Sequence, residues 1–196
     1  ICGVHIEGPF LNETQGYIGA HPVKHAKRSD LGEMKRLLEA AGGLTRIVTL
    51  APERDDGFMV TRFLTEQGIC VAAGHCDPSI KQLQESIEAG LKMFTHLGNG
   101  CPMELNRHDN VIQRVLSQRH DLWISFIPDG AHVPFVSFLP LVLSGYNSSH
   151  CSDLSSKGIW ALSYITALKT ELQINSQIDQ RMNNRLATYA AVKQLK

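Results

Sequence analysis

The first 145 residues alternate between short apolar runs and segments in which apolar residues recur every three or four positions. A short apolar run bounded by Gly or Pro is typical of a buried β-strand, and the longer spacing is typical of an amphipathic helix. Strands are predicted over residues 1–7, 46–50, 69–73, 91–95 and 122–127. Because these strands are apolar almost throughout, we expect a parallel sheet covered by helices.

Helices are predicted in the segments between the strands. Asp30, followed by Glu33, predicts the start of the first helix, and Asp77 with Pro78 predicts the N-cap and first turn of the third. The apolar helix faces contain Met34, Leu37, Leu38 and Ala41, then Val60, Phe63 and Leu64, then Ile80, Leu83 and Ile87, with further helices over residues 110–118 and 135–143. The alternation predicts an α/β fold.

Polar residues follow the C-terminal ends of successive predicted strands. They are Glu7, Glu53, His75, His96 and Asp129. A doubly wound sheet and an α/β barrel both fit the element order, but barrel enzymes keep their sites at these strand ends. No Gly-x-Gly-x-x-Gly segment follows a strand, which argues against a dinucleotide-binding fold. We therefore expect a (β/α)8 barrel, partial because 196 residues fall short of the roughly 250 that a whole barrel needs.

One carboxylate and two imidazoles among these residues form a candidate metal site. A carboxylate at the end of a buried strand is costly unless a positive charge meets it, so Glu7 with His75 and His96 favours a bound cation. His5 shares a strand face with Glu7, and packing and a supporting hydrogen bond are both open for it. For Glu53, we expect a carboxylate that holds a loop or supports a site residue, rather than one that contacts the metal itself.

Composition excludes several classes of protein. Net charge is zero and the basic residues are scattered, so neither a nucleic-acid footprint nor a basic membrane-binding face is expected. No apolar run approaches the roughly 20 residues of a membrane span, and no signal sequence opens the chain, so a cytoplasmic protein is expected. The chain starts inside a strand without Met, which favours a fragment of a longer protein.

Five cysteines, an odd number without paired CxxC spacing, argue against a disulfide framework and a zinc ribbon. Cys76 and Cys101 adjoin candidate site residues, but neither has a base at motif spacing. We expect both to be packing residues rather than nucleophiles.

Six short motifs occur in a recognisable order. They are His-Ile-Glu-Gly-Pro-Phe, Ile-Gly-Ala-His, Thr-Leu-Ala-Pro-Glu, Ala-Gly-His, Thr-His-Leu-Gly-Asn-Gly and Asp-Gly-Ala-His-Val. In this order and spacing, residues 1–145 resemble the N-acetylglucosamine-6-phosphate deacetylases of the amidohydrolase superfamily. The resemblance implies a metal-dependent (β/α)8 barrel flanked by a small β-sandwich. The sandwich would come from chain segments outside this sequence.

The resemblance also implies roles for individual residues. Glu7, His75 and His96 match the ligands of a divalent metal, for which zinc is the expected ion. The implied reaction converts N-acetylglucosamine 6-phosphate and water into glucosamine 6-phosphate and acetate. The residues that match substrate contacts are Ala20, His21, Asn99, Gly100, Arg107 and His132. Arg107 matches a phosphate partner, and its planar guanidinium suits two phosphate oxygens.

Residues 146–196 depart from the family pattern. The family carries its acid-base Asp in a Thr-Asp-Ala strand end, whereas this chain has Asp153 after residues 146–152, which are too polar for a buried strand. Residues 159–196 contain neither Gly nor Pro, and residues 168–174 and 186–196 fit only weakly amphipathic helices. We expect this tail to be unrelated to the family, through a reading-frame change or a truncated gene. An in-frame helical ending is the alternative.

Three functions follow from these patterns. The first is a phosphosugar deacetylase. The second is a catalytically inactive remnant that still binds metal and sugar phosphate. The third is a different amidohydrolase, acting on another N-acyl or a cyclic amide substrate. Both a monomer and a homo-oligomer are compatible with the sequence. An open barrel would expose strand edges, which predicts low stability or aggregation.

Overall fold

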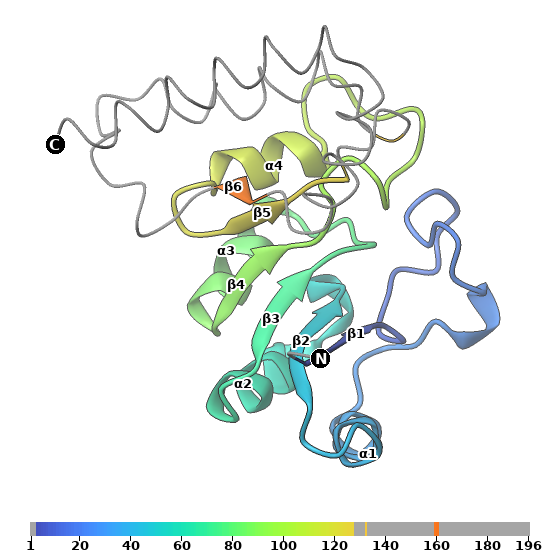
Figure 1. The fold of residues 1–196 in the computed structure, drawn as a ribbon. Coiled ribbons are helices and arrows are strands. Elements are labelled where there is room, and N and C mark those ends of the chain that lie inside the picture. The colour runs from blue at the N-terminus through green and yellow to red at the C-terminus, as the bar shows by residue number, and fades with distance from the viewer. Residues whose placement is uncertain (1–2, 128–131, 133–158, 161–196) are drawn as a thin grey trace, which may run out of the picture.

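Six parallel strands form the sheet of the computed structural model, which describes residues 3–127, 132 and 159–160. The strands are β1 (Val4–Glu7), β2 (Thr45–Leu50), β3 (Cys70–Ala73), β4 (Leu91–Phe94), β5 (Trp123–Ser125) and β6 (Ile159–Trp160). Each strand pairs with the next one in the sequence, so the sheet order is the chain order (Figure 1). Repeated one-strand steps in a parallel sheet build the wall of a barrel. The predicted partial (β/α)8 barrel is confirmed.

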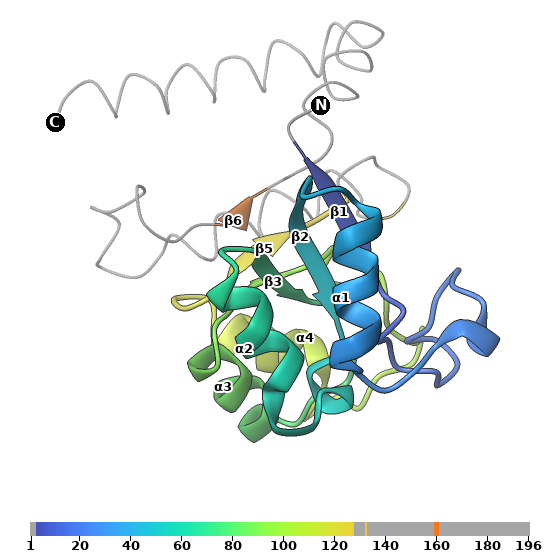
Figure 2. The ribbon, with the colours of Figure 1, turned by 90° about the horizontal axis from the view of Figure 1, so that it is seen from below.

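Four helices connect the first five strands and lie along one side of the sheet (Figures 1 and 2). They are α1 (Leu31–Ala40), α2 (Met59–Glu66), α3 (Ile80–Glu88) and α4 (Val111–Ser117). Short 3-10 turns occupy η1 (Val23–His25), η2 (Pro52–Arg54) and η3 (Asp56–Phe58). Each helix lies in a segment where apolar spacing predicts one, because a face of regularly spaced apolar residues can be buried against the strands.

Two helix starts differ in how well the sequence predicts them. The Asp30 side chain accepts a 2.7 Å hydrogen bond from the Glu33 amide, which confirms it as the N-cap of α1. The predicted Asp77 cap of α3 is wrong, because Ser79 caps that helix in a capping box with Gln82. The Asp77 carboxylate instead accepts a 2.8 Å hydrogen bond from Arg114 of α4. A long-range ion pair therefore replaced the local cap.

The core lies between the sheet and the helices. Val48, Leu50, Val71, Leu91 and Ile124 point from the strands, and Met34, Leu64, Leu83 and Val115 point from the helices. All nine of these side chains are fully buried. Burying each such side chain contributes roughly 1.5–3 kcal/mol to folding. This packing fixes the strands and therefore the places where their C-terminal ends lie.

Several sequence predictions fall outside the described residues. They concern Asp129, Asp153, the helix over 135–143 and the tail helices over 168–174 and 186–196. Strand β6 lies within the predicted tail and pairs with β5, with Ile159 opposite Ile124. The sequence pattern did not predict this strand, and the division at residue 145 stays a prediction. Among the described residues, no helix combines the length and apolar character that crossing a membrane requires.

Candidate metal centre

Three predicted ligands meet at the C-terminal ends of the strands. Glu7 is the last residue of β1, His75 follows β3 by two residues, and His96 follows β4 by two. The Oε1 atom of Glu7 lies 2.8 Å from Nε2 of His96 and 3.2 Å from Nε2 of His75. One ligand atom from each residue lies within 4.8 Å of the others. The curvature of the sheet thus brings Glu7 to two histidines that lie 68 and 89 positions farther along the sequence.

The imidazole of His75 has a defined orientation. Its Nδ1 lies 2.8 Å from the backbone carbonyl oxygen of Tyr17. A carbonyl oxygen can only accept, so Nδ1 carries the proton and Nε2 presents its lone pair to Glu7. The ring is wedged between two glycines, since a Cβ atom would lie 3.0 Å from the ring at Gly19 and 2.8 Å at Gly100. This tautomer leaves Nε2 available as a metal ligand.

His96 is held mainly through its backbone. Its amide donates a 2.8 Å hydrogen bond to the Ser125 hydroxyl, and its ring meets that of His75 edge to face with centroids 4.8 Å apart. Both histidines adopt left-handed backbone conformations, with φ of 50° at His75 and 36° at His96. Such conformations cost of order 1–3 kcal/mol for a non-glycine residue and gather at functional sites. The surrounding structure must therefore hold both residues in place.

Electrostatics favour an ionised Glu7 among the imidazole rings. The close approach of the His75 imidazole, and after it that of His96, holds the pKa of Glu7 well below its usual range. The fourth side chain at this place is His21, whose Nε2 lies 3.7 Å from Oε2 of Glu7 and whose ring lies 4.6 Å from that of His75. Burial, followed by the neighbouring His75, lowers the pKa of His21. The cluster therefore places one ionised carboxylate among three imidazole rings.

A hydrogen-bonded polar chain that runs from the exposed His5 to two buried threonines lies next to the cluster. The Nε2 of His5 lies 2.7 Å from the Thr49 hydroxyl, which is 2.7 Å from the hydroxyl of Thr95. Burial lowers the pKa of His5. His5 is thus a hydrogen-bonding residue on the face of β1 that carries Glu7, and it links that strand to β2 and to the end of β4.

The comparisons with known proteins find deacetylases of amino-sugar phosphates. No protein-family model matches the chain. The chain is 36% identical over 133 residues to the N-acetylglucosamine-6-phosphate deacetylase of Bacillus subtilis, covering 67% of this chain and 33% of the relative. It is 33% identical over 138 residues to the human enzyme, with the same coverages. A solved structure of this deacetylase from Mycobacterium smegmatis, a variant in complex with N-acetyl-D-glucosamine-6-phosphate, matches with a TM-score of 0.65 and 31% sequence identity. The match covers 74% of this chain and 37% of the solved chain.

The chain is homologous to part of the N-acetylglucosamine-6-phosphate deacetylases. It spans about a third of the length of the deacetylases that it matches. A relative named N-acetylgalactosamine-6-phosphate deacetylase, from Escherichia coli O157:H7, is 28% identical over 133 residues. The resemblance inferred from the six motifs is thus confirmed at the level of the family and of the barrel.

The predicted substrate residues lie at different distances from the cluster. His21 and Gly100 contact it directly, as described above. Ala20 and Asn99 are exposed beside these two, and the Asn99 amide donates a 2.9 Å hydrogen bond to the His96 carbonyl. The structure therefore brings four of the six predicted substrate residues to the loops that border Glu7, His75 and His96.

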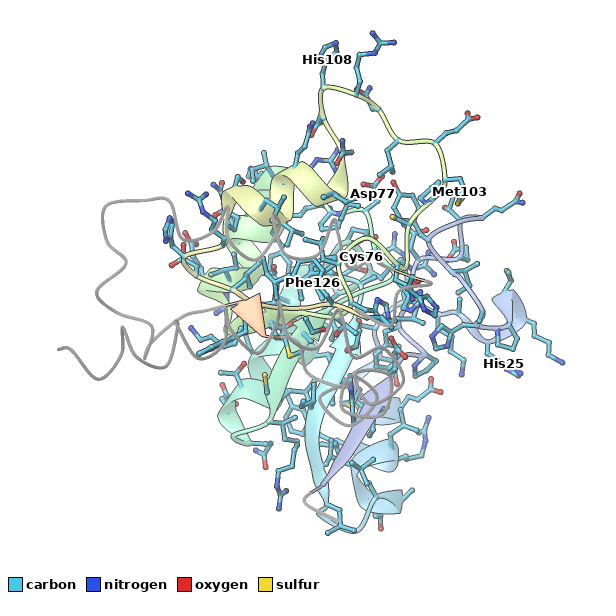
Figure 3. The ribbon with its side chains drawn as sticks, turned by 45° about the horizontal axis from the view of Figure 1, so that its top comes forward. His25, Cys76, Asp77, Met103, His108 and Phe126 are labelled. Atoms are coloured by element: carbon cyan, nitrogen blue, oxygen red, sulfur yellow. The ribbon has the colours of Figure 1, made fainter. Side chains whose placement is uncertain are left out.

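The other two predicted substrate residues lie farther out along the chain. Arg107 is exposed in the loop between β4 and α4, where its carbonyl accepts a 3.1 Å hydrogen bond from Gln113. Figure 3 shows the neighbouring His108 at the outer end of this projecting loop. His132 is exposed, and residues on both sides of it lie outside the described part of the chain. Substrate contacts of both residues stay predictions.

The two cysteines beside the site have the packing role that was expected. Cys76 is fully buried in the core cluster, and Cys101 is partly buried against it. Burial raises the pKa of both thiols. Protonated thiols are poor nucleophiles and poor metal ligands, so neither belongs to the candidate metal centre.

Sequence reasoning missed the hydrogen-bond partners of the two histidine ligands and of the neighbouring His5. The Tyr17 carbonyl, the Ser125 hydroxyl and the Thr49 hydroxyl each act across a gap of many residues. A backbone carbonyl leaves no signal in the side-chain pattern, and the two hydroxyls lie at ordinary strand positions. These contacts can be found only once the strands are placed next to one another.

Proposed function

We propose that Glu7, His75 and His96 bind a divalent metal ion, with zinc as the expected ion. The observation that carries this proposal is the 3.2 Å approach of Glu7 Oε1 to the His75 Nε2 lone pair. Two hydrogen-bond acceptors at this distance repel each other unless a cation or a proton lies between them. The Tyr17 carbonyl already fixes the imidazole proton on the other nitrogen, which favours the cation.

The chemistry of the donor atoms fits zinc. Two imidazole nitrogens and a carboxylate oxygen are a known ligand set of catalytic zinc sites, which keep a further coordination position open. When bound, the ion would supply the Lewis acidity that amide hydrolysis requires. His75 and His96 are mostly buried, with side chains only 6% and 14% exposed, whereas Glu7 is 32% exposed. The site is therefore open to solvent and substrate from the carboxylate side.

We infer that the substrate is N-acetylglucosamine 6-phosphate. Support comes from the names of the relatives and from the sugar phosphate bound in the Mycobacterium smegmatis structure. His21, whose pKa is lowered by burial, can donate a hydrogen bond to the acetyl oxygen. The backbone at Asn99 and Gly100 would contact the sugar, and Arg107 and His132 would bind the phosphate side. The chain's own residues would thus orient the amide toward the metal centre.

The proposed reaction breaks the amide C–N bond. Water adds to the acetyl carbon, the nitrogen takes a proton as it leaves, and acetate and glucosamine 6-phosphate are released. An acid-base residue must remove a proton from the water and deliver one to the amine. Asp153 is our candidate for this role, and it lies outside the described residues.

Acetate release from N-acetylglucosamine 6-phosphate, measured with the zinc-loaded chain, tests this function. Glu7→Gln should abolish turnover, and Asp153→Asn should abolish it while leaving zinc bound. Glu39→Gln, an exposed carboxylate on α1, is the matched control and should keep full activity. Zinc binding without acetate release by the unsubstituted chain would instead leave a metal-binding remnant. Equal turnover in the Glu7→Gln variant would refute the proposed metal centre.

A further inference from the structure

A ring of hydrogen bonds surrounds the main chain of His75, and Glu53 closes it. The Oε1 atom of Glu53 accepts from the Asn12 side-chain amide at 2.9 Å and from the Asp77 backbone amide at 2.6 Å. The Asn12 backbone amide in turn donates to the His75 carbonyl at 3.0 Å. A single carboxylate oxygen thus joins the loops that follow β1, β2 and β3.

We propose that Glu53 is a positioning residue that holds the backbone of His75 and, through it, the metal centre. This inference rests on the proposed function, because positioning matters only if His75 is a ligand. Glu53 itself lies outside the cluster of ligand atoms. It acts on both sides of His75, through Asn12 at the carbonyl and through Asp77 two residues farther along.

The conformation of His75 explains why such a hold is needed. Its φ of 50° lies in the left-handed region, which a residue with a Cβ atom adopts only when its surroundings impose it. The Tyr17 carbonyl fixes the ring, but a contact at Nδ1 leaves the backbone free to relax. The Asn12 and Asp77 contacts act on the backbone. Without Glu53, we expect the segment from His75 to Asp77 to sample right-handed or extended conformations that move Nε2 away from Glu7.

The remaining oxygen of Glu53 argues against a purely stabilising role. Oε2 is buried and has no hydrogen-bond partner among the described residues. Burial raises the pKa of this carboxyl group, so its ionised form costs folding free energy. Asp77 and Cys76 lie in the loop after β3 (Figure 3), where Cys76 is fully buried and Asp77 is partly buried. Glu53 thus lowers the stability of the fold while its hydrogen bonds hold the backbone on both sides of His75. This combination is expected of a residue that positions a metal ligand.

Zinc affinity of the purified 196-residue chain, measured by competition with a chromophoric chelator, tests the inference. Glu53→Ala should weaken zinc binding by about 10- to 100-fold. Glu53→Gln keeps an oxygen acceptor for both amides and should restore most of the affinity. Visible absorption of the Co²⁺-loaded chain should shift in the Ala variant and stay near the original in the Gln variant, since it reports ligand geometry.

Asp55→Ala is the matched control for a loss of folding stability. Asp55 lies two residues away and also accepts from two backbone amides, those of Val60 at 3.1 Å and Thr61 at 2.8 Å, but these belong to α2. This variant should unfold at lower urea concentration, while its folded fraction binds zinc with unchanged affinity. A loss of affinity as large as that of Glu53→Ala would overturn the inference, as would unchanged affinity in Glu53→Ala.

A readout on the metal-free chain separates this inference from the proposed function. In Glu53→Ala, amide hydrogen exchange at Asp77 should accelerate, and the ¹⁵N signals of the His75 ring should lose the pattern of a single tautomer. Neither should change in Asp55→Ala. If the unsubstituted chain binds no zinc, the proposed function fails. The Asp77 exchange rate and the His75 ring signals still test whether Glu53 positions His75. Protection of Asp77 that survives in Glu53→Ala would refute it.

Discussion

Two threonines on β2 offer a direct test of the polar chain beside the metal centre. Both side chains are buried, Thr49 at 0% and Thr45 at 4% exposure. The Thr49 hydroxyl has two partners, His5 and Thr95. The Thr45 hydroxyl is buried with no partner among the described residues. Replacing each with Val exchanges a hydroxyl for a methyl group of similar size, so the two variants differ mainly in the hydrogen bonds that are lost.

The expected magnitudes follow from these contacts. Thr49→Val breaks two hydrogen bonds of 2.7 Å and leaves the hydroxyl of Thr95, only 6% exposed, without this partner. At about 0.5–1.5 kcal/mol for each bond, we expect the free energy of unfolding to fall by about 1–3 kcal/mol. Thr45→Val removes a hydroxyl that is buried without a hydrogen bond and therefore destabilises the fold. We expect the free energy of unfolding to stay the same or to rise by up to about 1 kcal/mol.

Urea unfolding, followed by far-ultraviolet circular dichroism and extrapolated to water, measures both values. The slope with urea should be the same for both variants and the unsubstituted chain, because the exposed surface does not change. Similar changes in the free energy of unfolding for Thr49→Val and Thr45→Val would show that the hydrogen bonds of the Thr49 hydroxyl do not contribute to stability. That result would refute the reasoning.

Three further predictions concern single residues near the site. The free energy of unfolding of the unsubstituted chain, relative to that of Glu53→Gln, should be greatest in acid and should decline as the pH rises through the raised pKa of Glu53. The reason is that the folded state binds the Glu53 proton more tightly than the unfolded chain does. Urea unfolding across this pH window measures the difference, and a difference that grows with pH would contradict the prediction. Gly100→Ala would place a Cβ atom 2.8 Å from His75 Nδ1 and should lower zinc affinity by about 10-fold or more in chelator competition, while Gly32→Ala on α1 should leave it unchanged; equal affinities would count against the wedged ring. Cys76, buried and with its pKa raised by burial, should react with iodoacetamide only in denaturant, and its modification in the folded chain, seen by peptide mass mapping, would contradict the packing described above.

The strands, the helices and the three candidate ligands could be predicted because each follows from a local sequence pattern. Apolar runs become buried strands whose C-terminal ends share one edge of a parallel sheet. Glu7, His75 and His96 each follow such a run, so their meeting follows from the topology alone. The start of α1 could likewise be predicted, because the Asp30 side chain accepts a hydrogen bond from the Glu33 amide in the same helical turn.

Contacts between distant segments could not be predicted in this way. Asp77 looks like a helix cap in the sequence, but Arg114, 37 positions away, takes its carboxylate. The bridge that Glu53 makes to Asn12 depends on the relative placement of three loops. Strand β6 comprises only Ile159 and Trp160, too few residues for any periodicity to appear. In each case the partner is set by the tertiary structure and not by the neighbours in sequence.

X-ray absorption of the zinc-loaded chain tests the central claim most directly, because it reports the atoms bound to the ion. The account predicts nitrogen and oxygen ligands, with the scattering pattern of two imidazoles from His75 and His96, and a loss of bound zinc in Glu7→Gln. A chain that binds no zinc, a zinc site with sulfur ligands, or zinc retained in full by the Glu7→Gln variant would contradict the proposed metal centre.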